Sequence, residues 1–371
     1  MSNYETILSE NCKVFTDTLD NNSLGMLNAL IESNIGKDAD IRVIPDVHAG
    51  TGCVIGTCMD TIGKVSPILL GGDLGCGVTG IKLEGKPKIN LEKLDKFIDF
   101  EIPYGMRIHD KERNTDNNIL DSLKCRVFNK NKALRSIGTL GGGNHFIELG
   151  IENGNYWLIV HSGSRHLGSE IAEFYKNKAK EQHPEEPYAF AYLDGEPVND
   201  FINDIDILKK FAYINRLTIL KNICNEMKWK YSLHDSINSC HNFIESIGAI
   251  GYRMRKGCID ADIGMRSIIP INMRDGSLIV TGKGNKDWSC SAPHGAGRLM
   301  SREEARNSIT LSQFKKSMKG IYSTSIMKST IDESPMVYKS IDYISERIED
   351  TVRIDSIIKP IYNFKADGET K

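Results

Sequence analysis

A glycine-containing turn between two histidines is the feature that most constrains how this chain folds. Strand-like runs flank the turn Glu-Asn-Gly at residues 152–154. Glycine tolerates the left-handed backbone conformation, so the sequence predicts a hairpin with a three-residue loop. That register pairs Ile151 with Asn155 and, counting outward, His145 with His161. Directly opposed side chains on antiparallel strands share one face, with Cβ atoms roughly 5 Å apart. We therefore expect the two imidazoles to lie at one site.

Two alternatives stand beside this interpretation. A two-residue loop would shift the pairing by one position and place the rings on opposite faces of the hairpin. Both residues could also be ordinary core histidines that bind nothing. Because His145 and His161 flank one hairpin and each is close to glycines, we favour a shared metal site, for which imidazole is a common ligand.

A second cluster of chemically active residues is the run Gly-Gly-Asp-Leu-Gly-Cys-Gly at positions 71–77. The carboxylate of Asp73 is a hard ligand and the thiolate of Cys76 is a soft one, a combination that suits a borderline ion such as Mn²⁺, Co²⁺ or Zn²⁺. Sulfur has enough lone pairs to bridge two ions. The alternative is a tight turn with a buried cysteine. His241 is a weaker prediction, as a possible fifth ligand.

A third run, at residues 291–302, combines His294 with glycines and Arg298 ahead of a helix that a Ser301–Glu304 capping box should start. Backbone amides in such a turn bind anions, and arginine grips phosphate with two donors. His294 could then be a nucleophile on phosphorus, because imidazole is largely neutral near pH 7. The alternative is a histidine that only donates a hydrogen bond to phosphate.

Strand patterns gather early in the chain and helical patterns concentrate later, without regular alternation. This predicts the α+β class: a single mixed domain over residues 1–371, with a sheet core, glycine-rich active-site loops and surrounding helices. The expected strands cover residues 41–44, 54–58, 78–83, 146–151, 157–160 and 278–280. The expected helices cover residues 91–100, 170–180, about 200–227 and 341–348, with a further helix starting at Ser301.

Composition narrows the class of protein. The net charge of −2 gives no overall field that would attract nucleic acid or membrane, so any nucleic-acid contact would depend on local clusters of lysine and arginine. The nine cysteines have no regular spacing and include no CxxC pair, which indicates reduced thiols. We find no signal peptide and no apolar run of membrane-spanning length, and we expect a soluble cytoplasmic protein without a membrane partner.

With these residues in view, the chain resembles the RtcB family of GTP-dependent RNA ligases from about residue 46 to residue 365. The motifs that carry the resemblance are Asp-Val-His-Ala-Gly from Asp46, Gly-Asp-Leu-Gly-Cys-Gly from Gly72, Gly-Gly-Gly-Asn-His-Phe-Ile-Glu from Gly141, His-Ser-Gly-Ser-Arg from His161, Arg-Lys-Gly from Arg255 and His-Gly-Ala-Gly-Arg from His294. The family joins RNA 3′-phosphate or 2′,3′-cyclic phosphate ends to 5′-hydroxyl ends.

The resemblance implies a role for each matching residue. His294 would attack the α-phosphate of GTP and carry GMP covalently before the RNA 3′ end is guanylylated. Two Mn²⁺ ions would be held by Asp73, Cys76, His145, His161 and His241, with Cys76 as a bridge. The nucleotide would be contacted by Asn144, Phe146, Glu148, Asn242, Ser277, Gly295, Ala296, Gly297 and Lys365. Phosphate or RNA would be bound by Arg165 and Arg298.

The chain departs from the family at one place that bears on guanine recognition. Where members commonly read Pro-Gly-Ser-Met-Gly, this sequence has Ile271 and Asn272 after Pro270, although Ser277 still aligns. The expected partners are GTP and a broken or intron-cleaved RNA such as a tRNA, and the resemblance leaves open an archease-type activator. The competing hypotheses are a dimetal phosphoesterase or nuclease, and a non-catalytic RNA-binding protein.

Overall fold

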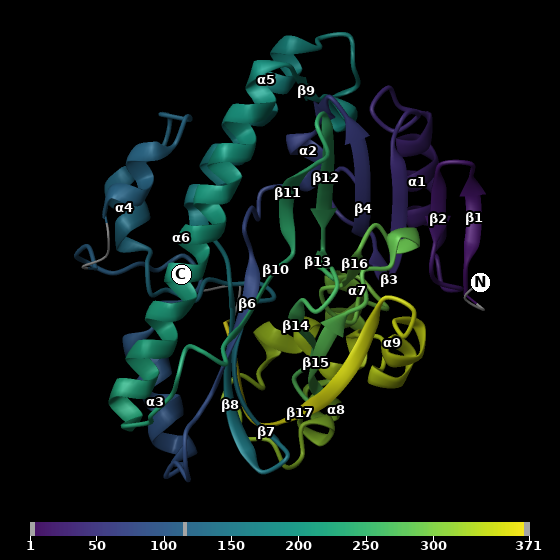
Figure 1. Ribbon diagram of the computed structural model, residues 1–371. Coiled ribbons are helices and arrows are strands. Elements are labelled where there is room, and N and C mark those ends of the chain that lie inside the picture. Colours follow the sequence, from purple (N-terminus) through teal and green to yellow (C-terminus); the bar gives the residue numbers. More distant parts are fainter. Residues whose placement is uncertain (1–3, 114–116, 367–371) are drawn as a thin grey trace.

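Two β-sheets form the centre of a computed structural model that describes residues 4–113 and 117–366 (Figure 1). The six-stranded sheet is mixed, because β2 and β3 run parallel whereas its other neighbouring strands are antiparallel. In spatial order its strands are β1 (Thr6–Ser9), β2 (Cys12–Val14), β3 (Asp40–His48), β4 (Ile55–Ile62), β12 (Gly251–Lys256) and β11 (Asn242–Ile247).

The seven-stranded sheet is antiparallel throughout. In spatial order its strands are β10 (Ile237–Cys240), β6 (Gly77–Lys82), β8 (Asn155–Ser162), β7 (Phe146–Glu152), β17 (Val352–Lys365), β15 (Gly276–Gly282) and β14 (Arg266–Asn272). Two short pairs complete the strands of the described residues: β13 (Cys258–Asp260) with β16 (Ser291–Pro293), and β5 (Lys64–Val65) with β9 (Leu193–Asp194).

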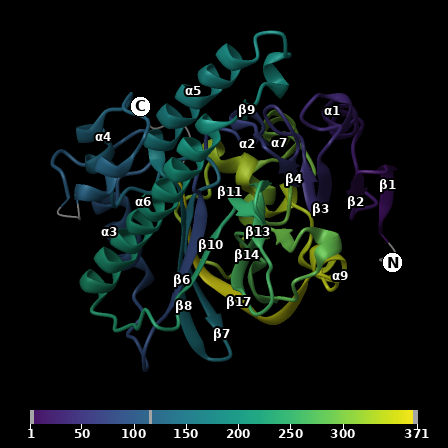
Figure 2. The same ribbon diagram turned by 45° about the horizontal axis from the view of Figure 1, so that its top comes forward.

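Helices surround the sheets, so the expected mixed α+β domain is confirmed (Figures 1 and 2). They are α1 (Asn21–Glu32), α2 (Pro67–Leu70), α3 (Leu91–Glu101), α4 (Lys130–Arg135), α5 (Arg165–Gln182), α6 (Glu196–Met227), α7 (Arg302–Ser308), α8 (Leu311–Ser317) and α9 (Ile341–Arg347). Helix α7 starts at the expected Ser301–Glu304 capping box. Short 3₁₀ turns occur at Asn117–Ser122, Tyr188–Phe190, Lys286–Trp288, Lys328–Glu333 and Pro335–Val337.

Helix α6 covers one face of the seven-stranded sheet. Phe211, Ile219 and Ile223 recur at helical spacing and are fully buried, and the helix contacts β6 and β8. Both views show α6 lying along these strands (Figures 1 and 2). The helix therefore places its middle turns directly beneath the strands that carry the candidate metal ligands.

The predicted register of the histidine hairpin is wrong by one residue. Glu152 pairs with Asn155, so the loop has two residues, and Phe146 is the residue opposite His161. Asn153 has φ 48° and the following Gly154 has φ 80°, the two left-handed positions that a type I′ turn needs and that Asn-Gly supplies.

The two histidines nevertheless meet, because His145 precedes the first residue of β7 and is not bound to the alternation of the strand. Their ring centroids are 5.2 Å apart. The glycine-rich loop before β7, and not the pleat, turns the ring of His145 toward His161. The conclusion drawn from the hairpin is right, although the register that led to it is not.

The topology brings four candidate ligands to one end of the seven-stranded sheet. Neighbouring strands β10, β6, β8 and β7 alternate in direction, so the end of β10, the start of β6, the end of β8 and the start of β7 coincide. His241 follows β10, Cys76 precedes β6, His161 lies near the end of β8, and His145 precedes β7.

Candidate active site

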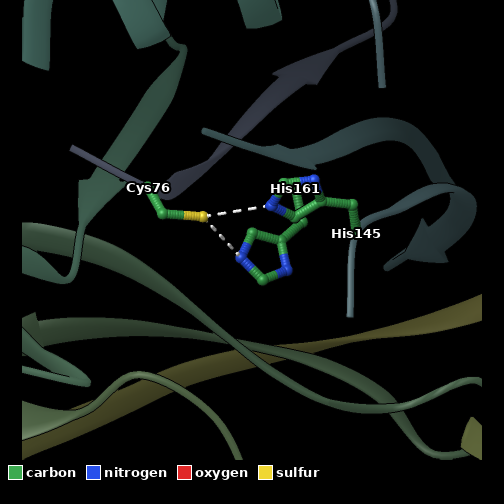
Figure 3. Close-up of side chains that lie close together, drawn as sticks. All are labelled: Cys76, His145 and His161. Atoms are coloured by element: carbon green, nitrogen blue, oxygen red, sulfur yellow. Dashed lines mark hydrogen bonds between the residues drawn. The ribbon is translucent and has the colours of Figure 1, made fainter. Parts of the chain in front are cut away.

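A buried cysteine and two histidines form the centre of the site (Figure 3). The sulfur of Cys76 lies 3.4 Å from Nε2 of His145 and 3.3 Å from Nε2 of His161. The exposed fraction is 0% for Cys76, 6% for His145 and 4% for His161. Three ligand atoms therefore converge on one point that is shielded from water.

His241 extends the cluster to a third imidazole. Its Nε2 lies 3.1 Å from Nε2 of His161, and its other ring nitrogen is buried without a hydrogen-bond partner in the described part of the chain. His145 donates its Nδ1–H to the carbonyl of Leu140, at 2.8 Å, which leaves the lone pair of Nε2 for a ligand. Lone pairs that face one another at this distance fit a cation between them.

Burial sets the protonation of the cluster. Loss of hydration lowers the pKa of His145 to about 4 and lowers the pKa values of His161 and His241 well below the usual range. The three imidazoles are therefore neutral, which is the form that binds metals. Burial and the nearby Asp73 carboxylate raise the pKa of the Cys76 thiol well above its usual value, so a thiolate at this position needs a cation beside it.

Asp73, another of the expected ligands, lies close to Cys76. A Cβ atom on Gly163 would lie 2.7 Å from Oδ1 of Asp73 and 3.4 Å from the sulfur of Cys76. Both ligand atoms therefore lie close to the backbone of Gly163, which is possible because glycine has no side chain. One carboxylate, one sulfur and three imidazole nitrogens form a donor set that fits borderline divalent ions such as Mn²⁺.

His294 lies beside this cluster. Its ring centroid is 4.6 Å from that of His241, and its Nδ1 lies 2.7 Å from Oδ2 of Asp46. Asp46 has an exposed fraction of 0%. When His294 is neutral, the carboxylate of Asp46 holds the proton on Nδ1, so Nε2 is left with a free lone pair.

His294 opens into a cavity of about 1050 Å³, ample for a nucleotide. The cavity is lined by the expected residues Asn144, Phe146, Glu148, Gly295, Ala296, Gly297, Arg298 and Lys365. His161 also lines it, as do Ile271 and Asn272, the two residues at which this chain departs from the family pattern. His48, Asn363, Arg302 and Tyr338 also line it. The structure thus brings most of the residues expected around a nucleotide to the lining of one cavity.

Glu148 forms a polar end of the cavity. The hydroxyl of Ser277 donates to its Oε1 and the amide of Asn363 donates to its Oε2, both at 3.2 Å. Burial raises the pKa of Glu148 to about 8, although these two hydrogen bonds and the charge of Lys365 oppose the shift. The carboxyl group is therefore largely protonated at neutral pH, and it offers both a donor and an acceptor to a ligand.

Lys365 closes the cavity from the last strand. Its ammonium lies 2.8 Å from Oε2 of Glu333, donates to the carbonyl of Asn144 at 3.1 Å, and lies 5.2 Å from the ring centroid of Phe146. Burial alone would raise the pKa of Glu333, but the charges of Lys365 and Arg302 lower it to about 2. Glu333 is therefore a carboxylate that fixes the direction of Lys365.

Some expected residues lie elsewhere. Ser277 acts through Glu148 and does not line the cavity. Asn242 donates to the carbonyl of Asp73 at 3.1 Å and accepts from the amide of Gly257 at 2.8 Å, so it joins two loops next to the cluster. Arg165 donates to Thr139 and Gly105 behind the histidine loop and does not line the cavity.

Arg298 does line the cavity, but its donors are partly engaged. It donates to the carbonyl of Asp332 at 2.8 Å and to that of Met300 at 3.2 Å, and its guanidinium lies 5.4 Å from the ring centroid of Tyr338. These contacts fix the side chain in the wall, so a phosphate would meet an arginine whose position is already set.

Asp46 and Glu333 are among the residues of the site that sequence reasoning missed as functional residues. Asp46 carried a signal, because an acid among the otherwise apolar residues 43–47 needs a buried partner. Glu333 carried none, since its partners Lys365 and Arg302 are distant in sequence and only the packing of the chain joins them.

Together the fold and the site define an α+β protein with a buried cysteine–histidine cluster, of the kind that holds a divalent metal ion, on the wall of a large cavity. A family model described as tRNA-splicing ligase RtcB matches residues 34–128 and 106–366. The chain belongs to the RtcB family.

Relatives in bacteria and archaea align over most of the chain. The RNA-splicing ligase RtcB of Escherichia coli K12 is 30% identical over 88% of this chain and 90% of its own length. The RNA-splicing ligase RtcB2 of Escherichia coli ATCC 25922 is 28% identical over 96% of both chains. The tRNA-splicing ligase RtcB of Aeropyrum pernix is 27% identical over 82% of this chain and 83% of its own. Within the described ranges, no helix has both the length and the apolar character to span a membrane.

Proposed function

We propose that this protein is a GTP-dependent RNA ligase that joins RNA 3′-phosphate or 2′,3′-cyclic phosphate ends to 5′-hydroxyl ends. The observation that carries the proposal is the placement of His294. Asp46 holds the proton on one ring nitrogen, and the other nitrogen is free beside the cysteine–histidine cluster and the cavity. The names of the relatives, RNA-splicing and tRNA-splicing ligases, support the same class of reaction.

In the proposed first step, Nε2 of His294 attacks the α-phosphorus of GTP. The bond from that phosphorus to the bridging oxygen breaks and pyrophosphate leaves, so a nitrogen–phosphorus bond links GMP to the ring. Asp46 stabilises the positive charge that develops on the imidazole through its hydrogen bond to Nδ1. Two Mn²⁺ ions held by Asp73, Cys76 and the three cluster histidines would lower the negative charge on the phosphates.

In the later steps the nucleotide activates the RNA end. An oxygen of the RNA 3′-phosphate attacks the phosphorus of GMP, and His294 leaves. The 5′-hydroxyl of the other RNA end then attacks the activated 3′-phosphate, loses its proton to solvent, and expels GMP. A 2′,3′-cyclic phosphate must first be opened by water, because only the open form offers the attacking oxygen.

The base would lie at the end of the cavity that contains Glu148. Its protonated carboxyl, the ammonium of Lys365 and the ring of Phe146 offer a donor and an acceptor, a cation and an apolar face within one pocket. Ile271 and Asn272 line the same cavity. We propose that this pair takes the place of the small residues that other members of the family have there.

The proposal is tested with two RNA fragments, one ending in a 3′-phosphate and the other beginning with a 5′-hydroxyl. With Mn²⁺ and GTP we expect a joined product, and without GTP we expect none. Hydrolysis of the RNA in the absence of GTP would identify a dimetal phosphoesterase or nuclease. Binding of the fragments without any reaction would identify a non-catalytic RNA-binding protein.

Asp46→Asn should slow the formation of the covalent nucleotide adduct by roughly 10²–10⁴-fold, as expected when the carboxylate that orients a catalytic histidine is lost. The rate of adduct formation is measured with labelled GTP on the full chain. The equilibrium binding of GTP is measured in parallel and should change little. Asp40→Asn is a matched control, because Asp40 lies on the same strand and pairs with Arg42. Equal adduct rates in wild type and Asp46→Asn would contradict the role of Asp46.

Glu148→Gln should remove a pH dependence of stability. The pKa of Glu148 is about 8 in the folded protein against an ordinary value of 4.5. Between these values the unfolded chain has lost the proton that the folded chain retains, so the free energy of unfolding of the wild type falls as pH rises, by a few kcal/mol at most. Melting temperatures of both proteins between about pH 5 and pH 9 test this. Parallel pH profiles would show that Glu148 is not protonated at neutral pH.

A further inference from the structure

Two consecutive polar residues in the middle of α6 lie beneath the cysteine–histidine cluster. Asn215 and Arg216 have exposed fractions of 0% and 1%, although polar side chains of this size are rarely buried without a specific partner. Each of them bonds to segments that carry a ligand of the cluster. Neither residue belongs to a motif that pointed to the site.

Arg216 joins three neighbouring strands. Its Nε donates to the hydroxyl of Thr79 on β6 at 2.7 Å, its Nη1 to the carbonyl of Ser162 on β8 at 2.7 Å, and its Nη2 to the side-chain oxygen of Asn238 on β10 at 2.9 Å. All three acceptors are neutral. The guanidinium places its donors in one rigid plane, which a flexible lysine ammonium does not reproduce.

One ligand lies on or directly next to each of these strands, close to the contact. Thr79 is three residues after Cys76, Ser162 directly follows His161, and Asn238 is three residues before His241. One side chain therefore sets the spacing of three strands at the end where their ligands meet.

Asn215 performs the same task for the fourth ligand. Its Oδ1 accepts from the amides of Gly138 and Thr139, at 2.8 and 3.0 Å, and its Nδ2 donates to the hydroxyl of Ser162 at 3.0 Å. That hydroxyl donates in turn to the carbonyl of Leu140 at 2.8 Å, the same carbonyl that receives the Nδ1–H of His145.

We propose that Asn215 and Arg216 are positioning residues that preassemble the metal site by holding its four buried ligands, Cys76, His145, His161 and His241, at bonding distance before an ion enters. This inference rests on the proposed metal site and extends it from the ligands to the helix behind them. Residues behind a metal ligand that fix its orientation commonly change metal affinity by 10–100-fold.

The test is a titration of the metal-free full chain with Co²⁺, which reports its ligands through its visible spectrum and through the charge-transfer band of a cobalt–thiolate bond. We expect Arg216→Met to bind Co²⁺ roughly 10–100-fold more weakly than wild type, with a diminished thiolate band. Arg216→Lys keeps the positive charge but cannot make the three hydrogen bonds in one plane. Its Co²⁺ affinity should lie between those of wild type and Arg216→Met. Asn215→Leu should weaken binding and alter the part of the spectrum that depends on the imidazoles.

A buried polar residue on the same helix provides the control. Asp204 has an exposed fraction of 0% and bonds to the amides of Lys124 and Cys125 and to the hydroxyl of Tyr175, none of which is a ligand of the cluster. Asp204→Asn should lower the melting temperature but leave the Co²⁺ spectrum and affinity unchanged. If Arg216→Met does not fold, Thr79→Val carries the test, because it removes one hydroxyl, which accepts from Arg216 and donates to Asn238, with little change in shape.

The outcomes distinguish failure of the proposed metal site from failure of the proposed positioning role. If wild type shows no cobalt–thiolate band, the proposed metal site is wrong. If wild type shows the band and the Arg216 and Thr79 variants bind Co²⁺ with the same affinity and spectrum, the metal site stands and the positioning role is refuted. Loss of Co²⁺ binding in Asp204→Asn to the same extent would also refute it, because general destabilisation would then explain the result.

Discussion

His294→Ala should carry no label after incubation with Mn²⁺ and α-labelled GTP, and its RNA ligation should fall by at least about 10³-fold. The wild-type chain should keep the label through denaturing electrophoresis. The reason is that Nε2 of His294 is the free nitrogen that the Asp46 contact leaves beside the cluster and the cavity. Alanine removes the atom that would form the bond to phosphorus.

A preactivated substrate shows which step is lost. RNA whose 3′-phosphate already carries GMP needs no transfer from the enzyme, so His294→Ala should seal it to a 5′-hydroxyl end at a rate near that of wild type. His234→Ala is the control for loss of an imidazole, because His234 is exposed and does not line the cavity. Labelling of His294→Ala at the wild-type level would overturn the proposed nucleophile. Failure on the preactivated RNA would give His294 a further role in sealing.

Cys76→Ser should abolish metal binding and, with it, both the labelling and the sealing of preactivated RNA. A serine hydroxyl is a poor substitute, because it does not ionise in a site this buried and lacks the polarisable lone pairs of sulfur. Since the sulfur lies within 3.4 Å of two imidazole nitrogens, its loss opens the centre of the cluster. We expect metal affinity to fall by more than about 100-fold, beyond the usual effect of a residue behind the ligands.

Cys224→Ser is the matched control, since Cys224 is equally buried but lies on α6 in another part of the core. Metal content measured after dialysis, together with the two activities, distinguishes the variants. The combination of wild-type metal content and absent activity in Cys76→Ser would show that the sulfur acts in the chemistry and not as a ligand. Unchanged metal content and activity would remove Cys76 from the site.

Local patterns in the sequence were sufficient for five of the helices and six of the strands in the described residues. The apolar spacing of residues 91–100, 200–227 and 341–348 gave helices that the structure confirms as α3, α6 and α9. Strand β17 was missed, because charged residues and Pro360 interrupt its alternation. It forms only because β7 and β15 flank it on both sides. Tertiary pairing overrides weak local preference at such positions.

The hairpin shows where local reasoning is limited. The turn was located correctly, but its length was not, because a glycine after asparagine is compatible with a loop of two or of three residues. The contact between His145 and His161 survived the wrong register, since the ring of His145 lies outside the paired region. A side chain in a glycine-rich loop is placed by its surroundings and not by the pleat.

The sequence by itself determined the chemistry available to this protein: the kinds of ligand, the neutral imidazole next to glycines, and the family to which these motifs belong. Only the tertiary structure decided which of these groups meet. Asp46 reaches His294, Glu333 reaches Lys365, and Asn215 and Arg216 support four strand ends, across separations that no local pattern spans. Residue type fixes what an atom can bind, whereas distance and burial, which fix its charge and partners, exist only once the chain has packed.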